Sequence, residues 1–139
     1  MRDEVIARLN RRFDAYADLI DTITPDRLTA TVDVPKHKTL AEHFWCVVGA
    51  RESYARAIHT GAWDGFACSM DTFELADFKA SLASSASKVQ HALDDVQDWH
   101  AAREELLATL AEHEVMHEGQ IIRHMYALGE SLPDSWTWA

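Results

Sequence analysis

The sequence has few residues that could cross-link the chain or anchor it in a membrane. Its 139 residues include only two cysteines, Cys46 and Cys68, which are too few for a disulfide scaffold, so we expect reduced thiols. No segment reaches the ~18–20 consecutive apolar residues of a membrane-spanning helix. The first residues, Met1-Arg2-Asp3-Glu4, carry acids where a secretion signal carries basic residues. We therefore expect a soluble, cytoplasmic protein with no membrane partner.

Basic residues are also scarce. The chain has 13 Lys and Arg against 23 Asp and Glu, which gives a formal net charge of -10. A nucleic-acid-binding surface needs clustered positive charge, and the one cluster, at Arg8, Arg11 and Arg12, is diluted by acidic neighbours. We expect no nucleic-acid partner. Hydrophobic residues make up 47% of the chain, which predicts one folded domain over residues 1–139.

Strand-like alternation of polar and apolar residues is missing, whereas apolar residues repeat at helical spacing. In the first predicted helix they follow one another at intervals of three or four residues: Val5, Leu9, Phe13, Tyr16 and Ile20. The same reasoning predicts helices at about 3–23, 39–60, 71–96 and 98–128. Thr24-Pro25 predicts at most a short additional turn.

Capping residues mark the ends of these helices. Thr39-Leu40-Ala41-Glu42 has the form of a capping box, and Asp71-Thr72-Phe73-Glu74 resembles a second one. Asp98 can cap the last helix, while Gly61 and Gly129 are placed to end the second and the fourth. Four amphipathic helices predict an all-α four-helix bundle, and the long loops between the first three helices indicate a crossover connection.

His113 and His117 lie one helical turn apart in the stretch His113-Glu114-Val115-Met116-His117. They share an apolar stripe with Leu110, which should face the core, and unpartnered imidazoles there would each cost about 1–3 kcal/mol. A divalent metal ion removes this cost by accepting a lone pair from each ring. His43 faces inward on the second predicted helix, so the three rings predict one metal site with coordination positions left for water or substrate.

Other residues near this site have competing interpretations. Cys46 is an alternative ligand because thiolates suit zinc, but it points ~60° away from the His43 stripe, which favours a packing role. His124 lies ~10 Å beyond His117 along the helix, so we expect it to line the cavity or to contact a neighbour. The remaining histidines are expected to be solvated: His37, His59, His91 and His100.

Three further residues are candidates for roles around the metal. Glu114 lies at the flank of the metal-facing stripe, where it could serve as a general base or as a partner that supports a metal ligand, although a solvated position on the helix surface is the simpler expectation. Tyr54 and Gln120 are candidate cavity-lining residues. The tryptophans are expected in packing or interfaces rather than in a substrate platform.

Two other metal sites share parts of this pattern. The five residues from His113 to His117 match the zinc-protease motif, but the long form of that motif needs Gly and His where this chain has Gln120 and Arg123. A di-iron carboxylate bundle needs two Glu-x-x-His motifs on two helices, and Glu114 to His117 is the only one. Neither interpretation agrees with the sequence.

The segment Thr39-Leu40-Ala41-Glu42-His43-Phe44, followed far downstream by His113-Glu114-Val115-Met116-His117-Glu118-Gly119-Gln120-Ile121, resembles the DinB/YfiT-like superfamily of metal-binding four-helix bundles. The likeness extends over nearly the whole chain. His43, His113 and His117 match the three ligand positions of that family. The chain departs from the family at Glu118, where relatives often carry arginine.

The resemblance implies a divalent metal ion (zinc, nickel, iron or manganese) held by three histidines. It also implies a small-molecule substrate and a metal-dependent hydrolase, or a transferase or isomerase that uses a low-molecular-weight thiol such as bacillithiol or mycothiol. Homodimers are common in the family. The alternative from another class is a non-catalytic, metal-stabilised bundle that acts in binding or dimerisation.

Overall fold

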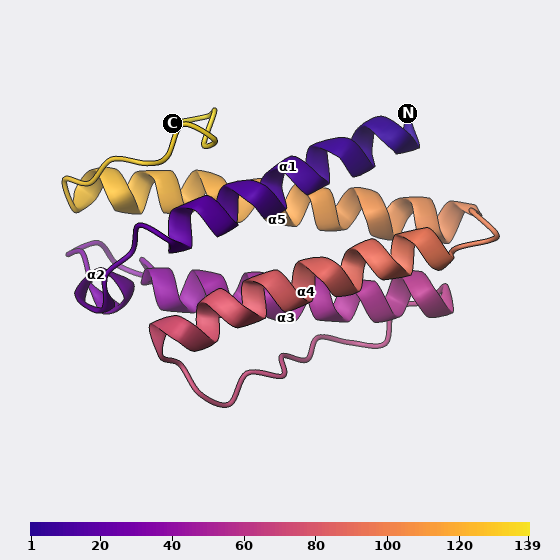
Figure 1. Cartoon of the computed structure of the whole chain (residues 1–139), viewed down its shortest axis with the longest axis horizontal. Helices are drawn as coiled ribbons and strands as arrows, with labels where there is room; N and C mark the ends of the chain where they lie inside the picture. Colours follow the sequence, from indigo (N-terminus) through magenta and orange to yellow (C-terminus); the bar gives the residue numbers. More distant parts are fainter.

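A computed structural model describes residues 1–139 and contains helices but no strands. Figure 1 shows the five helices of this all-α structure. Their bounds are α1 Arg2–Ile20, α2 Pro25–Thr29, α3 Leu40–Thr60, α4 Leu75–Asp95 and α5 Ala101–Ala127. The four long helices correspond to the four predicted from the apolar spacing, and α2 is the short turn predicted after Thr24-Pro25.

The four long helices lie side by side as a bundle in which α1 contacts α4 and α5, and α3 contacts the same two helices. Figure 1 shows that α1 and α5 run in one direction along the bundle and that α3 and α4 run in the other. Residues 61–74 connect the parallel helices α3 and α4 by returning along the length of the bundle. This connection is a crossover of the kind that the loop lengths predicted.

The helix ends agree only partly with the predicted caps. Thr39 accepts from the backbone amide of Glu42 and the Glu42 carboxylate accepts from that of Thr39, so the predicted capping box of α3 is confirmed. Gly61 ends α3 with φ +88°, in the left-handed region that favours glycine. The start predicted for α4 at Asp71 is wrong, because Glu74 and Asp77 form the box and the helix begins four residues later.

The predicted start of α5 is also wrong. Its N-cap is His100, two residues after Asp98. The Asp98 backbone carbonyl instead accepts a hydrogen bond from the Arg103 side chain, which also donates to the carbonyls of Ile58 and His59. Arg103 therefore fastens the first turn of α5 to the end of α3.

The apolar core is divided by a polar layer. One cluster includes Tyr16 and Phe44, and a smaller one includes Phe13 and Leu107. The Arg51 guanidinium lies 4.5 Å from the centre of the Phe13 ring and 5.1 Å from that of Tyr16, between members of the two clusters. The functional candidates described below lie near this layer.

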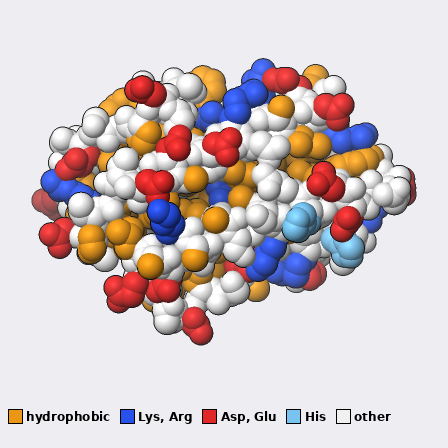
Figure 2. Space-filling view, in the orientation of Figure 1, with side chains coloured by type: hydrophobic (Ala, Val, Ile, Leu, Met, Phe, Trp, Pro, Cys, Tyr) orange, Lys and Arg blue, Asp and Glu red, His pale blue; other side chains and the backbone are white.

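The C-terminal tail is packed on the bundle through Trp136, which is buried and donates from its indole nitrogen to the Ala15 carbonyl. Charged side chains of both signs are interspersed over the face in Figure 2, and that face has no continuous basic surface. None of the helices combines the length and the apolar character needed to cross a membrane.

Candidate metal centre

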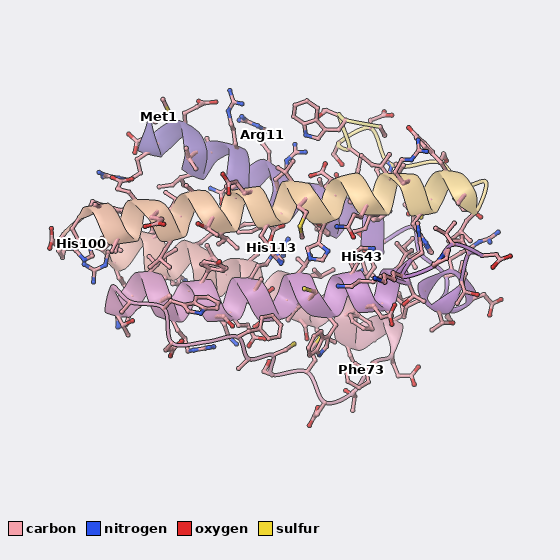
Figure 3. The ribbon with its side chains drawn as sticks, turned by 180° about the vertical axis from the view of Figure 1, so that it is seen from behind. Met1, Arg11, His43, Phe73, His100 and His113 are labelled. Atoms are coloured by element: carbon pink, nitrogen blue, oxygen red, sulfur yellow. The ribbon has the colours of Figure 1, made fainter.

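Two neighbouring helices supply the donors of the candidate site. His43 and Cys46 lie one turn apart near the start of α3, and His113 and His117 lie one turn apart on α5. Because α3 packs against α5, the two pairs meet between the helices. Figure 3 shows His43 and His113 extending into the space that separates α3 from α5.

The donor atoms are close enough to bind one metal ion. Ligand atoms of Cys46, His113 and His117 all lie within 4.8 Å of one another. Cys46 Sγ is 3.7 Å from His113 Nε2. Tetrahedral coordination would place such donors roughly 3.3–3.6 Å apart, so only small movements would be needed. The sequence favoured a packing role for Cys46 and did not predict this proximity. The angular position of a residue on one helix does not show which residues of the neighbouring helix lie opposite it.

His43 reaches the same group through His117. Their Nδ1 atoms are 2.8 Å apart, and their ring centres are 5.1 Å apart. This separation is that of a hydrogen bond in which one ring donates and the other accepts. Such a hydrogen bond fixes the tautomer and the orientation of the ring, as is usual for histidines that bind metals.

Unpartnered ring nitrogens show how well these residues suit a cation. His113 Nδ1 and His117 Nε2 are both buried and have no hydrogen-bond partner. Each buried polar atom without a partner costs about 1–3 kcal/mol, and a bound metal ion would remove such a cost by accepting a lone pair. The donor set of imidazoles and a thiol is one that zinc and other first-row transition metals take.

The protonation states also suit a cation. Burial, followed by the charge of Lys38, lowers the pKa of His43 to about 4, and burial, followed by the neighbouring His113, lowers the pKa of His117 to about 3. Burial likewise lowers the pKa of His113. The three rings are therefore neutral at pH 7 and keep a free lone pair. Burial raises the pKa of the Cys46 thiol, so Cys46 must lose a proton before it can act as a thiolate ligand.

Glu114 is fully buried, and the expectation that it is solvated is wrong. Arg51 Nε donates to Glu114 Oε1 at 2.7 Å and Arg51 Nη2 donates to Oε2 at 2.9 Å. Arg51 also donates to the Leu82 carbonyl of α4, and the Tyr16 hydroxyl of α1 donates to the Glu114 carbonyl. All four long helices are thus linked through one residue position between the two metal-facing histidines. Sequence periodicity had no means of finding this pair, because Arg51 belongs to a different helix.

Glu118 is buried as well and forms an ion pair with Arg12 of α1, at 2.6 Å. Its second carboxylate oxygen has no partner. Burial raises the pKa of Glu118, and the Arg12 guanidinium opposes that rise. Glu118 is therefore used for an ion pair that joins α5 to α1.

The remaining candidate residues lie in three different places. Gln120 lines a hollow that also includes His43, whereas Tyr54 lines a separate one with Trp63 at the other end of α3. His124 is fully buried, and its ring stacks on that of His37 with centres 5.0 Å apart. The expectation that His37 is solvated is wrong, since its Nε2 is buried. His59, His91 and His100 are exposed, as predicted.

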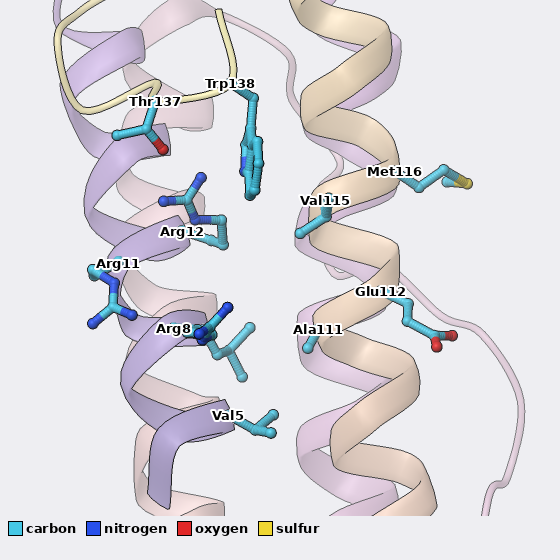
Figure 4. Close-up of a pocket in the computed structure, with 11 residues that line it drawn as sticks. Val5, Arg8, Arg11, Arg12, Ala111, Glu112, Val115, Met116, Thr137 and Trp138 are labelled. Carbon is cyan, nitrogen blue, oxygen red and sulfur yellow. The ribbon is translucent and has the colours of Figure 1, made fainter. Parts of the chain in front are cut away.

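A further cavity lies away from all of these histidines. It has a volume of about 770 Å³ and runs between α1 and α5. Figure 4 shows Trp138 from the tail beside this cavity, with Val5 on one side and Val115 on the other. Its lining is mainly apolar, includes three arginines and contains neither histidine nor cysteine, and Glu112 supplies its one carboxylate.

A comparison of the chain with known protein families and with curated proteins finds no match. The functional assignment therefore depends on the geometry and chemistry of the site.

Proposed function

We propose that the chain binds one divalent transition-metal ion through His43, His113 and His117, and that it belongs to the DinB/YfiT-like metal-binding bundles. The observation that carries this proposal is that His113 and His117, each with a buried ring nitrogen that has no partner, lie within metal-binding distance of each other, and that His43 Nδ1 of α3 lies 2.8 Å from His117 Nδ1. His43 is preferred over Cys46 as the third ligand because a neutral ring needs no deprotonation, whereas burial raises the pKa of the thiol.

The reaction class that agrees best with this site is metal-dependent hydrolysis or thiol transfer to a small-molecule substrate. A bound divalent cation would lower the pKa of a coordinated water or thiol, which supplies a nucleophile near pH 7. His43 Nδ1 lies 2.8 Å from His117 Nδ1, so an ion bound by both rings would replace the hydrogen bond between them. The Arg51–Glu114 pair fixes the α5 turn between His113 and His117. Because Arg51 donates to both Glu114 oxygens, we assign Glu114 a positioning role rather than that of a general base.

Cys46 distinguishes the enzyme from the alternative, a metal-stabilised bundle without catalysis. If the Cys46 thiolate binds together with the three imidazoles, a tetrahedral zinc shell is complete and the site is structural. If the thiol stays protonated, the fourth position is open to water or substrate. The deep burial of His117, which is only 2% exposed, favours the structural alternative, whereas the hollow beside His43 favours the enzyme.

Cobalt(II) titration of the purified protein tests these assignments, because a thiolate ligand adds a charge-transfer band that imidazoles lack. We expect one cobalt ion per chain and no such band. We expect His43→Ala, which removes a proposed ligand, to weaken binding by more than the roughly 10–100-fold that loss of a ligand-supporting residue costs. Cys46→Ser and the exposed-site control His91→Ala should bind like the parent. A thiolate band that disappears in Cys46→Ser, with unchanged binding by His43→Ala, would assign the third position to Cys46 instead.

Activity measurements on the metal-loaded protein then separate the two classes of function. Ester and amide hydrolysis, and conjugation in the presence of low-molecular-weight thiols, should be measured for the parent and for His113→Ala. Turnover that is lost in His113→Ala supports the enzyme. Metal binding that raises thermal stability, with no turnover in either assay, supports the structural alternative.

A further inference from the structure

A hollow of about 370 Å³ lies beside the candidate metal centre, between the loop that precedes α3 and the C-terminal half of α5. The buried residue His43 forms part of its wall, so the hollow reaches from the protein surface to one of the proposed metal ligands. Polar and basic residues dominate its lining, which contains no Asp or Glu: Lys36, His37, Lys38, Gln120 and Arg123. This composition is unexpected in a chain with a net charge of -10.

The three cations of this hollow are the only ones in the protein without a partner. Every other Lys and Arg forms an ion pair or, for Arg103, donates to backbone carbonyls. Lys36, Lys38 and Arg123 make neither kind of contact. Exposed lysines are often solvated without a partner, but here all the unpaired cations of an acidic protein surround one cavity. The Glu42 carboxylate, which lines a neighbouring hollow with Lys38, accepts from the Thr39 amide and forms no ion pair with any of the three cations.

The loop that supplies two of these cations is held in an unusual conformation. Lys36 has φ +62°, and it is the only residue other than glycine with a positive φ. Bulky residues rarely adopt this left-handed conformation, and such positions are concentrated at functional sites. His37 anchors the loop by stacking on the buried His124 ring, which leaves His37 Nε2 buried without a partner.

We infer that this hollow binds the carboxylate or phosphate group of a small-molecule substrate whose reacting end lies at the metal. Lys36, Lys38 and Arg123 attract the oxyanion, and Gln120 offers its side-chain amide as an additional donor. Arg and Lys bind both carboxylates and phosphates, and charge-assisted hydrogen bonds are the stronger kind. The inference depends on the proposed function, because the anionic group would belong to a substrate of the same metal site.

Binding of malate and of inorganic phosphate, measured by calorimetry and by NMR shifts of Gln120 and Arg123, tests this inference. Both metal-free and metal-loaded protein should be used. We expect at least one of the two anions to bind and to shift these signals. Preference for malate would assign the site to a carboxylate, and preference for phosphate would assign it to a phosphoryl group.

The test variant combines three substitutions, Lys36→Asn, Lys38→Met and Arg123→Gln. The control is Lys79→Ala, which removes a lysine that is paired with Asp21 and lies outside the hollow. The triple variant should lose affinity by roughly tenfold or more, while the control keeps it. Asn is chosen at position 36 because it tolerates a positive φ. Circular dichroism shows whether the variants remain folded.

The outcomes separate this inference from the proposed function. Absence of binding by either anion, or equal binding by the triple variant, would overturn the anion site even if the metal binds as proposed. Anion binding to a protein that loads no metal, with loss in the triple variant, would support the anion site and overturn the proposed function.

Discussion

Arg51 and Glu114 are two opposite charges held in the interior of the bundle, with side chains exposed by no more than 1%. Removing one partner of a buried pair leaves an uncompensated charge, which is far more destabilising than the loss of an exposed pair. Glu114 lies between His113 and His117 in α5, so the pair contributes to the stability of the site as well as of the fold.

We predict that Glu114→Ala lowers the free energy of unfolding by about 3–5 kcal/mol. Lys79→Ala, which breaks the exposed pair with Asp21, should lower it by about 0–1 kcal/mol. The double substitution Arg51→Met with Glu114→Leu should restore most of the loss, because neither buried charge then remains. Urea unfolding measures all three, and a loss below ~1 kcal/mol for Glu114→Ala would show that the pair does not hold the core.

At the residue scale the sequence predicted that His43, His113 and His117 face inward, but it was wrong for His37 and did not predict how the rings are supported. His43, His113 and His117 were found because their helical spacing places them on apolar stripes. The proximity of Cys46 to His113 and the pairing of Glu114 with Arg51 depend on which helices become neighbours. One helical wheel contains no information about that.

The connection between α3 and α4 packs closely on one face of α3. A Cβ added at Gly49 would collide with the Phe66 ring and lie 2.9 Å from Cys68 Cβ. Glu52 fastens the same connection, because its carboxylate accepts from the backbone amide and hydroxyl of Ser69 and pairs with Lys88 of α4. The crossover is therefore positioned by close packing against Gly49 and by hydrogen bonds to Glu52.

We predict opposite effects for two glycine substitutions within helices. Gly49→Ala should destabilise the protein by about 1–3 kcal/mol, since Phe66 and Cys68 must move away. Gly119→Ala, where an added Cβ meets nothing within 4 Å, should stabilise it by up to about 1 kcal/mol through helix propensity. Thermal unfolding of the two variants measures this difference. Equal effects would mean that the crossover does not pack on α3 as described.

At the element scale the apolar spacing predicted the long helices, and the Thr39–Glu42 box fixed the start of α3. The starts of α4 and α5 were misplaced by a few residues, because several acidic or hydroxyl residues near each start could act as the cap. The residue that acts as the cap depends on the path of the chain through the crossover and through the turn at Asp98. Tertiary contacts such as those of Arg103 determine this path.

The bundle as a whole keeps several imidazoles neutral, and this links its stability to pH. The pKa of His43 is lowered to about 4 and that of His117 to about 3, from an ordinary value of 6.5, and burial is the largest cause. The unfolded chain therefore binds protons, below about pH 6.5, that the folded protein excludes. The stabilisation is complete above that pH and is lost as the pH falls toward the lowered pKa values.

We predict that the metal-free protein, prepared with a chelator, loses thermal stability steadily between pH 7 and pH 4. The double variant His43→Leu with His117→Leu should show a shallower dependence, because two of the groups responsible are gone. The exposed pair His59→Leu with His91→Leu serves as the control and should follow the parent. A parent-like slope in the His43 and His117 variant would contradict the buried, neutral state of these rings.

Metal binding should also stabilise the whole molecule, because the unfolded chain does not bring α3 and α5 together. At a free metal concentration 1,000 times the dissociation constant, the gain in unfolding free energy is about 4 kcal/mol. Thermal unfolding with and without a chelator measures it. An unchanged midpoint would mean that no ion is held between the two helices.

The most direct test is the metal content of the purified protein, measured by elemental analysis after saturation with zinc and removal of excess ions. The account predicts one zinc ion per chain for the parent and for the control His59→Ala with His91→Ala, and almost none for His113→Ala with His117→Ala. Equal zinc in the parent and in the His113 and His117 variant would contradict a metal centre between α3 and α5.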